Sequence, residues 1–451
     1  MAEKRIAIPE NWPRVVIIGA GFAGINAARA LGNFPVRVTL IDRKNYHLFQ
    51  PLLYQVALAV LSPGEIASPA RGILRKFQNV EVLMDEALGF DLERRCVKLK
   101  ETQEIHYDYL VVAAGATHSY FGHDEWAELA PGLKTIEDAT EIRRRVLLAF
   151  ELAERETAVH GMTAPLNFVV VGGGPTGVEL AGAISDITRH VLSVEFRAID
   201  PSRARVTLLE GGPRVLAAYT PDLSEKAEKQ LRDLGVEVHT NAMVTQLSPG
   251  KVTFKNANGG FETINSVVTL WGAGVKASHL GKALGVETDR TGRVLVDQYA
   301  NVPGHHEVFV IGDLAAFKQG DVYLAGVAPV AIQMGKYVAA AIKRDVEKLP
   351  RKPFHYFDKG TMATIGRSKA IAQIGKLHLS GFLAWAAWLF VHILFLIGFR
   401  NRLAVVAEWM WAYFTFQRGA RLITGSQELI GWREAEQLPA PDHEEQRVAG
   451  D

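Results

Sequence analysis

The chain has 451 residues, enough for two or three domains that each have their own hydrophobic core. Its 50 basic and 49 acidic residues give a net charge of +1, so no overall basic charge indicates a nucleic-acid partner. A single cysteine, Cys96, excludes intrachain disulfides, CxxC redox pairs and thiolate metal clusters. Residues 1–13 are charged and lack the apolar core of a signal peptide, so we expect no secretory signal and a cytosolic body.

A complete dinucleotide-binding pattern opens the chain. An apolar strand is predicted over 15–18, a helix over 25–31, and a second apolar strand over 36–41 that ends at Asp42. Between the first strand and the helix lies the glycine motif Gly19-Ala20-Gly21-Phe22-Ala23-Gly24.

Each position of this pattern has a physical role. Gly19 permits the tight turn, Gly21 lets a pyrophosphate approach the backbone, and Gly24 lets the helix pack close to the strand. The N–H groups at the start of the helix attract phosphate, and Asp42 can accept a hydrogen bond from a ribose hydroxyl. The predicted cofactor-binding residues of this stretch are Gly19, Gly21, Phe22, Ala23, Gly24, Asp42 and Arg43.

The same pattern occurs a second time. A buried strand predicted over 167–171 leads into GGGPTG at 172–177, and a strand over 205–209 ends at Glu210. The insertion at 193–204 accounts for the long spacing between the glycines and the acid. Two dinucleotide motifs indicate two different dinucleotides; the alternative is a duplicated domain with one inactive copy.

Three further motifs combine a strand with a small-residue turn. They are YDYLVVAAGA at 107–116, WGAGV at 271–275 and VFVIGDLA at 308–315. With the two glycine motifs, this order resembles the two-dinucleotide flavoprotein reductases over roughly residues 14–372. The resemblance implies an α/β fold with two Rossmann-like domains, in which the NAD-binding domain is inserted into the FAD-binding domain.

The resemblance also assigns the two sites. The first motif, with Asp42 and Asp313, would hold FAD, and the second, with Glu210, would hold the nicotinamide dinucleotide. Because a carboxylate at Glu210 accepts from a ribose 2′-hydroxyl and repels a 2′-phosphate, we expect NADH rather than NADPH, although Arg214 lies close enough to soften this preference. The further implied cofactor-binding residues are Ala114, Gly115, Asp313, Ala328, Gly172, Gly174, Gly177, Glu210 and Gly274.

The cysteine count limits the possible electron acceptors. Cys96 is predicted on a surface strand and has no partner cysteine, so disulfide reduction and sulfide–quinone reduction are excluded. A quinone, oxygen or a carrier protein such as a ferredoxin remains. Two stretches, YHLFQPLLYQVA at 46–57 and GVAPVAIQMG at 326–335, are similar to the type II NADH dehydrogenases, which are single-chain NADH:quinone oxidoreductases that do not pump protons.

That family carries A-Q-x-A-x-Q in the second stretch, and its glutamines line the quinone tunnel beside the flavin. Ala328, Ala331 and Gln333 match the motif, whereas Pro329 replaces the first glutamine and leaves the hydrogen-bond partner of the quinone open. The structural alternatives are a helix-surface amide for Gln333 and a loop cap for Gln50.

Glu179 follows the second glycine motif and is predicted in the first turn of the helix, where the helix dipole alone would favour a carboxylate. The resemblance instead places it between nicotinamide and isoalloxazine, orienting the cofactor or assisting proton transfer. It also places Lys369 near the flavin, with a surface lysine as the alternative. The predicted catalytic residues are Glu179, Gln333 and Gln50, and no metal site is predicted.

The C-terminal part contains 23 residues without charge, 377–399, enough to cross a bilayer core of about 30 Å. An amphipathic stretch follows over 403–416, with an apolar face made of Leu403, Val406, Met410 and Phe414. We favour helices that lie in the cytoplasmic leaflet over a single span, and a buried core or dimer helix is the third possibility. The polar residues 431–451 are predicted to be disordered.

The predicted domains are an FAD-binding domain at 10–130 and 291–345, an NADH-binding domain at 131–290 and a membrane-anchoring region at 346–430. The predicted function is FAD-dependent oxidation of NADH with two-electron reduction of a membrane quinone, at the cytoplasmic face of the cell membrane. The alternatives are an NADH-dependent ferredoxin reductase and an NADH-sensing flavoprotein. The expected partners are quinone and lipid, no nucleic acid is expected, and a homodimer is possible.

Overall fold

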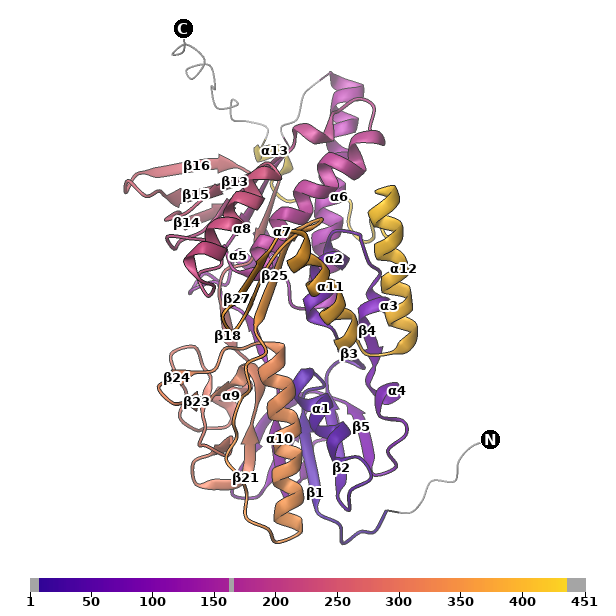
Figure 1. Cartoon of the computed structure of the whole chain (residues 1–451), viewed down its shortest axis with the longest axis vertical. Coiled ribbons are helices and arrows are strands. Elements are labelled where there is room, and N and C mark those ends of the chain that lie inside the picture. Colours follow the sequence, from indigo (N-terminus) through magenta and orange to yellow (C-terminus); the bar gives the residue numbers. More distant parts are fainter. Residues whose placement is uncertain (1–7, 162–165, 436–451) are drawn as a thin grey trace. The chain divides into compact units, whose positions relative to one another are not determined.

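A computed structural model of the chain describes residues 8–161 and 166–435 (Figure 1). Each of its two compact units is assembled from three stretches of chain. The first unit contains 8–49, Ala67–Ser119 and Val275–Lys359, and the second contains Gln50–Ile66, Tyr120–Gly274 and 360–435. These limits differ from the predicted boundaries because residues 50–66 and 360–435 pack with the second dinucleotide-binding fold.

The first unit is built on a six-stranded sheet in the order β20-β21-β9-β1-β2-β5. All neighbouring strands are parallel except β20, which pairs antiparallel with β21 at the edge. Continuous apolar runs form the central strands, as expected where both faces of a parallel sheet are buried. The bounds are β1 (Arg14–Ile18), β2 (Arg37–Asp42), β5 (Val80–Met84), β9 (Tyr109–Val112), β20 (Asn301–Val302) and β21 (His305–Val310).

Two helices, α1 (Phe22–Leu31) and α10 (Ala328–Val346), pack together against this sheet and run side by side in Figure 1. Their backbones approach closely, because a Cβ added at Gly335 would lie 2.2 Å from the carbonyl oxygen of Ala23. Pro329 occupies the first turn of α10, where its missing N–H is not needed. This packing brings the start of α10 to the first glycine motif.

Short elements complete the first unit. Cys96 lies in β7 and is buried, so the prediction of a surface strand was wrong for its side chain. The remaining elements are β3 (Tyr46–Leu48), β4 (Ala67–Pro69), α4 (Ala70–Leu74), β6 (Ala87–Asp91), β7 (Cys96–Leu99), β8 (Glu104–His106), β10 (Ala116–His118), β18 (Val275–Ala277), α9 (Leu280–Ala283), β19 (Val294–Leu295), η5 (Gly312–Leu314), β22 (Ala315–Ala316), β23 (Lys318–Gln319) and β24 (Val322–Tyr323).

The second unit contains a four-stranded parallel sheet in the order β13-β12-β11-β17 and an antiparallel sheet in the order β14-β15-β16. The strands are β11 (Asn167–Val171), β12 (Arg205–Leu209), β13 (Val236–His239), β14 (Met243–Ser248), β15 (Lys251–Lys255), β16 (Phe261–Asn265) and β17 (Val268–Trp271). The helices of this part are α5 (Trp126–Leu129), α6 (Ile136–His160), α7 (Pro175–Asp186), the π-turn η2 (Ile187–Val191), η3 (Leu192–Val194), η4 (Pro201–Arg203) and α8 (Pro221–Asp233).

The C-terminal segment adds a third sheet, β25-β26-β27, which packs directly on α7. Gly182 makes this possible, since a Cβ there would lie 1.7 Å from the carbonyl oxygen of Ile365. The added elements are β25 (Thr361–Gly366), β26 (Lys369–Ile374), β27 (Leu377–Ser380), α11 (Phe382–Phe395), α12 (Phe399–Thr415) and α13 (Trp432–Ala435). The early residues of the unit form η1 (Gln50–Leu52), α2 (Leu53–Ala57) and α3 (Pro63–Ile66).

The apolar run 377–399 is not one helix. Its first four residues form β27, Gly381 turns the chain with φ +70°, and α11 has only 14 residues. Across residues 8–161 and 166–435, no helix is both long enough and apolar enough to cross a membrane. Hydropathy alone did not reveal that the run divides between a strand and two helices.

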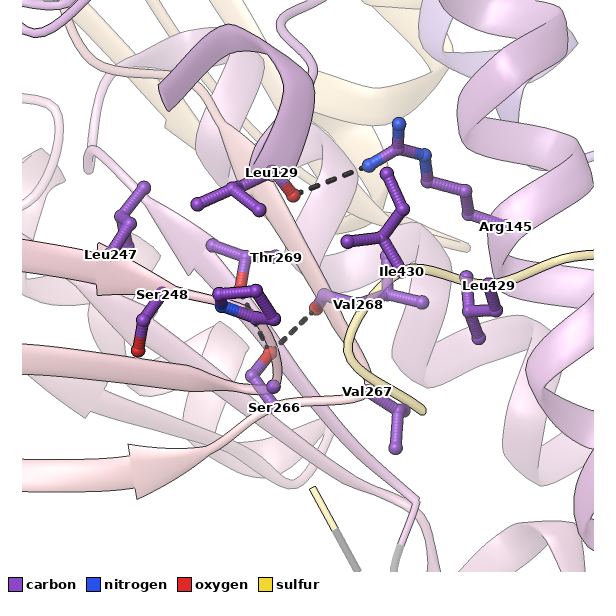
Figure 2. A pocket seen from close by; sticks show the side chains of 12 residues that line it. Leu129, Arg145, Leu247, Ser248, Ser266, Val267, Val268, Thr269, Leu429 and Ile430 are labelled. Atoms are coloured by element: carbon purple, nitrogen blue, oxygen red, sulfur yellow. Dashed lines mark hydrogen bonds between the residues drawn. The ribbon is translucent and has the colours of Figure 1, made fainter. Parts of the chain in front are cut away.

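The segment after α12 is fixed on the second unit. The Arg144 guanidinium donates to the carbonyl oxygens of Ser426 and Glu428, both at 2.8 Å. Figure 2 shows Leu429 and Ile430 beside Arg145 of α6, in a small pocket that also includes residues of β14 and β17. The prediction of disorder from residue 431 was therefore wrong at its start, because α13 begins at Trp432; residues 436–451 lie outside the described residues.

Candidate active site

The first glycine motif has the backbone geometry that a dinucleotide requires. Gly19 has φ +102°, and a Cβ there would lie 2.4 Å from the carbonyl oxygen of Ala113. A Cβ at Gly24 would lie 1.8 Å from the carbonyl oxygen of Gly19, whereas nothing lies within 4 Å of a Cβ at Gly21. Two glycines are therefore needed for packing, and the middle one leaves open space over the start of α1.

The acid that ends β2 is held against this motif. Asp42 accepts hydrogen bonds from the backbone N–H of Ala20 at 2.6 Å and of Lys44 at 2.7 Å. Burial raises the pKa of Asp42, and these two hydrogen bonds oppose the rise. The residues predicted to hold FAD all belong to the first unit: Gly19, Gly21, Phe22, Ala23, Gly24, Asp42, Arg43, Ala114, Gly115, Asp313 and Ala328.

The second motif repeats this geometry. Gly172 has φ +104°, and a Cβ there would lie 2.6 Å from the backbone nitrogen of Ala273. A Cβ at Gly177 would lie 1.8 Å from the carbonyl oxygen of Gly172, and nothing lies within 4 Å of a Cβ at Gly174. The residues present therefore fit a second dinucleotide at the start of α7.

Glu210 occupies the position that corresponds to Asp42. Its carboxylate accepts from the backbone N–H of Gly173 at 2.5 Å and of Gly212 at 2.6 Å. Arg214 donates to the carbonyl oxygens of Ala217 and Tyr219, so its guanidinium is engaged with its own loop. Gly172, Gly174, Gly177, Glu210 and Gly274 all lie in the second unit.

Glu179 lies on α7 in the same unit. The helix begins at Pro175, so Glu179 falls in the second turn, and its prediction in the first turn was wrong. Burial raises the pKa of this carboxyl to about 8, and a hydrogen bond with the backbone of Thr364 opposes the rise. A carboxyl with this pKa is mostly protonated at neutral pH, so a favourable charge–dipole interaction does not explain its presence.

Glu179 faces a cavity of about 120 Å³ that lies entirely within the second unit, among α2, α7, β25, α11 and α12. The wall is largely aromatic, with rings from Tyr54, Trp385, Trp388, Trp409, Tyr413 and Phe416. The polar lining consists of Gln55, Glu179, Asp186, Thr364, Arg367 and Arg418. An apolar cavity with a few placed polar groups is the usual form of a small-molecule site.

The two glutamines predicted to be catalytic have backbone contacts. Gln50 is exposed and donates to the carbonyl oxygen of Lys134 at 3.2 Å, which is the contact of a loop cap. Gln333, in the first unit, forms two hydrogen bonds with the backbone of Phe357. Its Nε2 donates to the carbonyl oxygen at 2.9 Å, and its Oε1 accepts from the N–H at 3.0 Å. Their catalytic roles remain predictions.

The sequence analysis missed Tyr54 and Gln55. Both belong to α2, whose five residues are all buried, and both line the cavity beside Glu179. The YHLFQPLLYQVA stretch contained them, but Gln50 and Gln55 are equivalent by residue type and only burial separates them. Lys369 begins β26, where it pairs with Gly366 of β25.

The fold and the two glycine motifs define a pyridine-nucleotide oxidoreductase with two dinucleotide sites. Residues 13–335 match the family model described as "Pyridine nucleotide-disulphide oxidoreductase", and residues 358–418 match the "NDH2 C-terminal domain".

The similar proteins are more specific. The chain is 46% identical to the type II NADH:quinone oxidoreductase Ndh of Mycobacterium tuberculosis, over 93% of this chain and 92% of that protein. It is 48% identical to NdhA of the same organism, over 91% of this chain and 89% of that protein. A structure of NDH2 from Plasmodium falciparum with NADH has the same fold, with a TM-score of 0.82, 19% identity and coverage of 92% of this chain and 100% of that chain. The chain therefore belongs to the type II NADH:quinone oxidoreductase family, as the sequence motifs predicted, and its cofactors are FAD and NADH.

We expect Glu210→Arg to shift the cofactor preference toward NADPH. The substitution removes the acceptor for a ribose 2′-hydroxyl and supplies a cation for a 2′-phosphate, so the ratio of kcat/KM for NADH to that for NADPH should fall at least about tenfold. Glu210→Gln is the matched control, since it removes the charge without adding a cation. An unchanged ratio in the arginine variant would contradict this role.

Glu179→Gln should change how stability depends on pH. The folded-state pKa of Glu179 is raised to about 8. Its favourable contribution to the free energy of unfolding is therefore complete below the pKa of the unfolded chain and is lost as the pH rises through 8. Glutamine does not titrate, so the variant should gain stability relative to the wild type between pH 5 and pH 9, by at most about 1.4 kcal/mol per pH unit. Urea unfolding at both pH values measures this, with the exposed Glu225→Gln as control for the chemistry of the substitution. A pH-independent difference between variant and wild type would refute the assignment.

Proposed function

We propose that the chain oxidises NADH through FAD and reduces a membrane quinone by two electrons without pumping protons. The aromatic cavity beside Glu179 carries this proposal, because it offers a flat apolar ring a stacked environment next to a protonated carboxyl. The cavity is walled on one side by α11 and α12. Glycine motifs of the geometry described above would hold FAD in the first unit and NADH in the second.

When bound, FAD and NADH would supply the redox chemistry, which is hydride transfer and the delivery of two electrons to the quinone. Reduction to the quinol takes up two protons, of which the hydride accounts for one and the solution supplies the other. Glu179 is mostly protonated at neutral pH and can donate a proton to a quinone oxygen in the cavity. Tyr54 is buried beside it, and burial followed by the charge of Glu179 raises the pKa of its hydroxyl, so Tyr54 remains a hydrogen-bond donor.

A lipid surface would supply the quinone. The predicted apolar face of α12 consists of Leu403, Val406, Met410 and Phe414, and the exposed fractions of these residues range from 37% to 74%. On α11 the exposed apolar side chains are Phe382, Leu383, Phe390, Leu394 and Phe395. Apolar surface of this extent marks an interaction site, and two helices with outward apolar side chains fit the interfacial region of a bilayer. We assign the cytoplasmic leaflet as their location.

Stopped-flow flavin spectroscopy tests the function. The purified, detergent-solubilised protein is mixed first with NADH and then with a short-chain ubiquinone or a ferredoxin. We expect rapid bleaching of the flavin by NADH and rapid reoxidation by the quinone. Bleaching followed by reoxidation with the ferredoxin alone would favour the carrier-protein reductase, and bleaching with no acceptor response would favour an NADH sensor.

Membrane binding is tested separately by Leu403→Glu combined with Met410→Glu. Each substitution removes a side chain whose burial in lipid contributes about 1.5 to 3 kcal/mol, so the partition coefficient should fall at least about 100-fold in vesicle sedimentation. Met243→Glu combined with Phe261→Glu is the control, since these exposed apolar residues belong to β14 and β16 of the same unit. Equal effects of the two pairs would show that α12 has no special part in lipid binding.

A further inference from the structure

A directed chain of hydrogen bonds connects α12 to the cavity. The indole Nε1 of Trp409 donates to Oε1 of Gln55 at 2.7 Å, and Nε2 of Gln55 donates to the hydroxyl of Tyr54 at 2.9 Å. Thr364 provides the next side-chain hydrogen-bond partner of Tyr54, and its backbone bonds Glu179. All five residues line the cavity and belong to the second unit, so this chain of hydrogen bonds lies within one unit.

The direction of this chain follows from chemistry. An indole N–H can only donate, so Gln55 must present its carbonyl oxygen to Trp409 and its amide N–H to Tyr54. The Tyr54 oxygen therefore accepts from Gln55, so the proton of its hydroxyl points away from Gln55. Both Tyr54 and Gln55 are buried, and at low dielectric such hydrogen bonds fix orientation strongly.

Trp409 also lies at the boundary between two environments. It is partly buried and packs on the ring of Trp388 at 5.9 Å, whereas its chain neighbours Met410 and Trp411 are 57% and 56% exposed. The helix therefore presents apolar side chains outward and one hydrogen-bond donor inward within three consecutive residues. A shift of α12 at its outer face would be transmitted to Gln55 through that donor.

We propose that Trp409 is a positioning residue that couples lipid binding by α12 to the quinone pocket, acting through Gln55 on the Tyr54 hydroxyl. The inference rests on the proposed quinone reduction. When α12 is bound to lipid, Trp409 fixes the orientation of Gln55, and the Tyr54 hydroxyl can donate its proton to the oxygen of a quinone in the cavity. When α12 is not bound to lipid, the Tyr54 hydroxyl is less well oriented, and quinone binds more weakly. Vesicles should therefore lower the KM for quinone in the wild type.

Trp409→Phe tests the coupling, because it keeps an aromatic ring and removes the indole N–H together with the second ring, a change of volume that Trp411→Phe shares. In vesicles of phosphatidylcholine and phosphatidylglycerol, we expect the KM for a short-chain ubiquinone to rise roughly three- to tenfold, the loss of one buried hydrogen bond. The rate of flavin reduction by NADH should not change, and the effect of vesicles on KM should disappear. Flavin content and the thermal unfolding midpoint verify that the variant is folded.

Two comparisons distinguish positioning from other effects. Trp411→Phe removes an indole N–H from the exposed side of the same helix and reports on lipid binding alone. In a Gln55→Leu background, Trp409→Phe should cause no further rise in KM, because both act through one contact. Additive effects, or a Trp409→Phe variant that matches Trp411→Phe, would overturn the inference and leave the proposed function intact. A wild type whose reduced flavin is not reoxidised by quinone would overturn the proposed function and the inference together.

Discussion

The contact between α7 and β25 is the constraint on which the site depends. No side chain fits between Gly182 and the carbonyl oxygen of Ile365, so the C-terminal sheet lies directly on the helix that begins at the second glycine motif. The same helix thus begins at the second glycine motif, whose geometry fits a dinucleotide, and its next turns form a wall of the cavity. Glu179 lies between these two regions, and its burial against β25 is what raises its pKa. Without the close approach at Gly182, the carboxyl would be hydrated and charged at neutral pH.

Two carboxyl groups line the cavity, those of Asp186 and Glu179, and they are stabilised there in opposite ways. A buried charge must be paired or neutralised, because its desolvation costs roughly several kcal/mol. Burial would raise the pKa of Asp186, but His190 and Arg418 hold it below its ordinary value, and the Arg418 guanidinium bonds the carboxylate directly. For Glu179, burial outweighs the opposing hydrogen bond with the Thr364 backbone, and the carboxyl is neutralised by its proton. The result is a cavity of small net charge that still contains a transferable proton, which suits an uncharged quinone that must be protonated on reduction.

The sequence predicted what local backbone geometry decides. The glycine motifs, the strands that precede them and the acids at Asp42 and Glu210 follow from steric rules within about 30 residues, and the structure has them where those rules place them. The interior of the cavity could not be predicted in this way. Whether Gln50 or Gln55 is buried depends on α11 and α12, more than 300 residues later in the chain. The break in the apolar run at Gly381 was also hidden, because strand, helix and membrane segment are all apolar and only the turn geometry separates them.

The second half of the C-terminal segment illustrates why an apolar helix need not be a core helix or a membrane span. In α12, Trp409 and Tyr413 point to the cavity, four residues apart and therefore on one side of the helix. Leu403, Met410 and Phe414 are exposed on another side. A helix that is apolar on two sides requires two apolar environments, and within residues 8–161 and 166–435 the cavity is one of them, whereas Leu403, Met410 and Phe414 stay exposed. The proposed lipid surface is the second environment, and it would place a quinone dissolved in that surface next to the helix that borders the cavity.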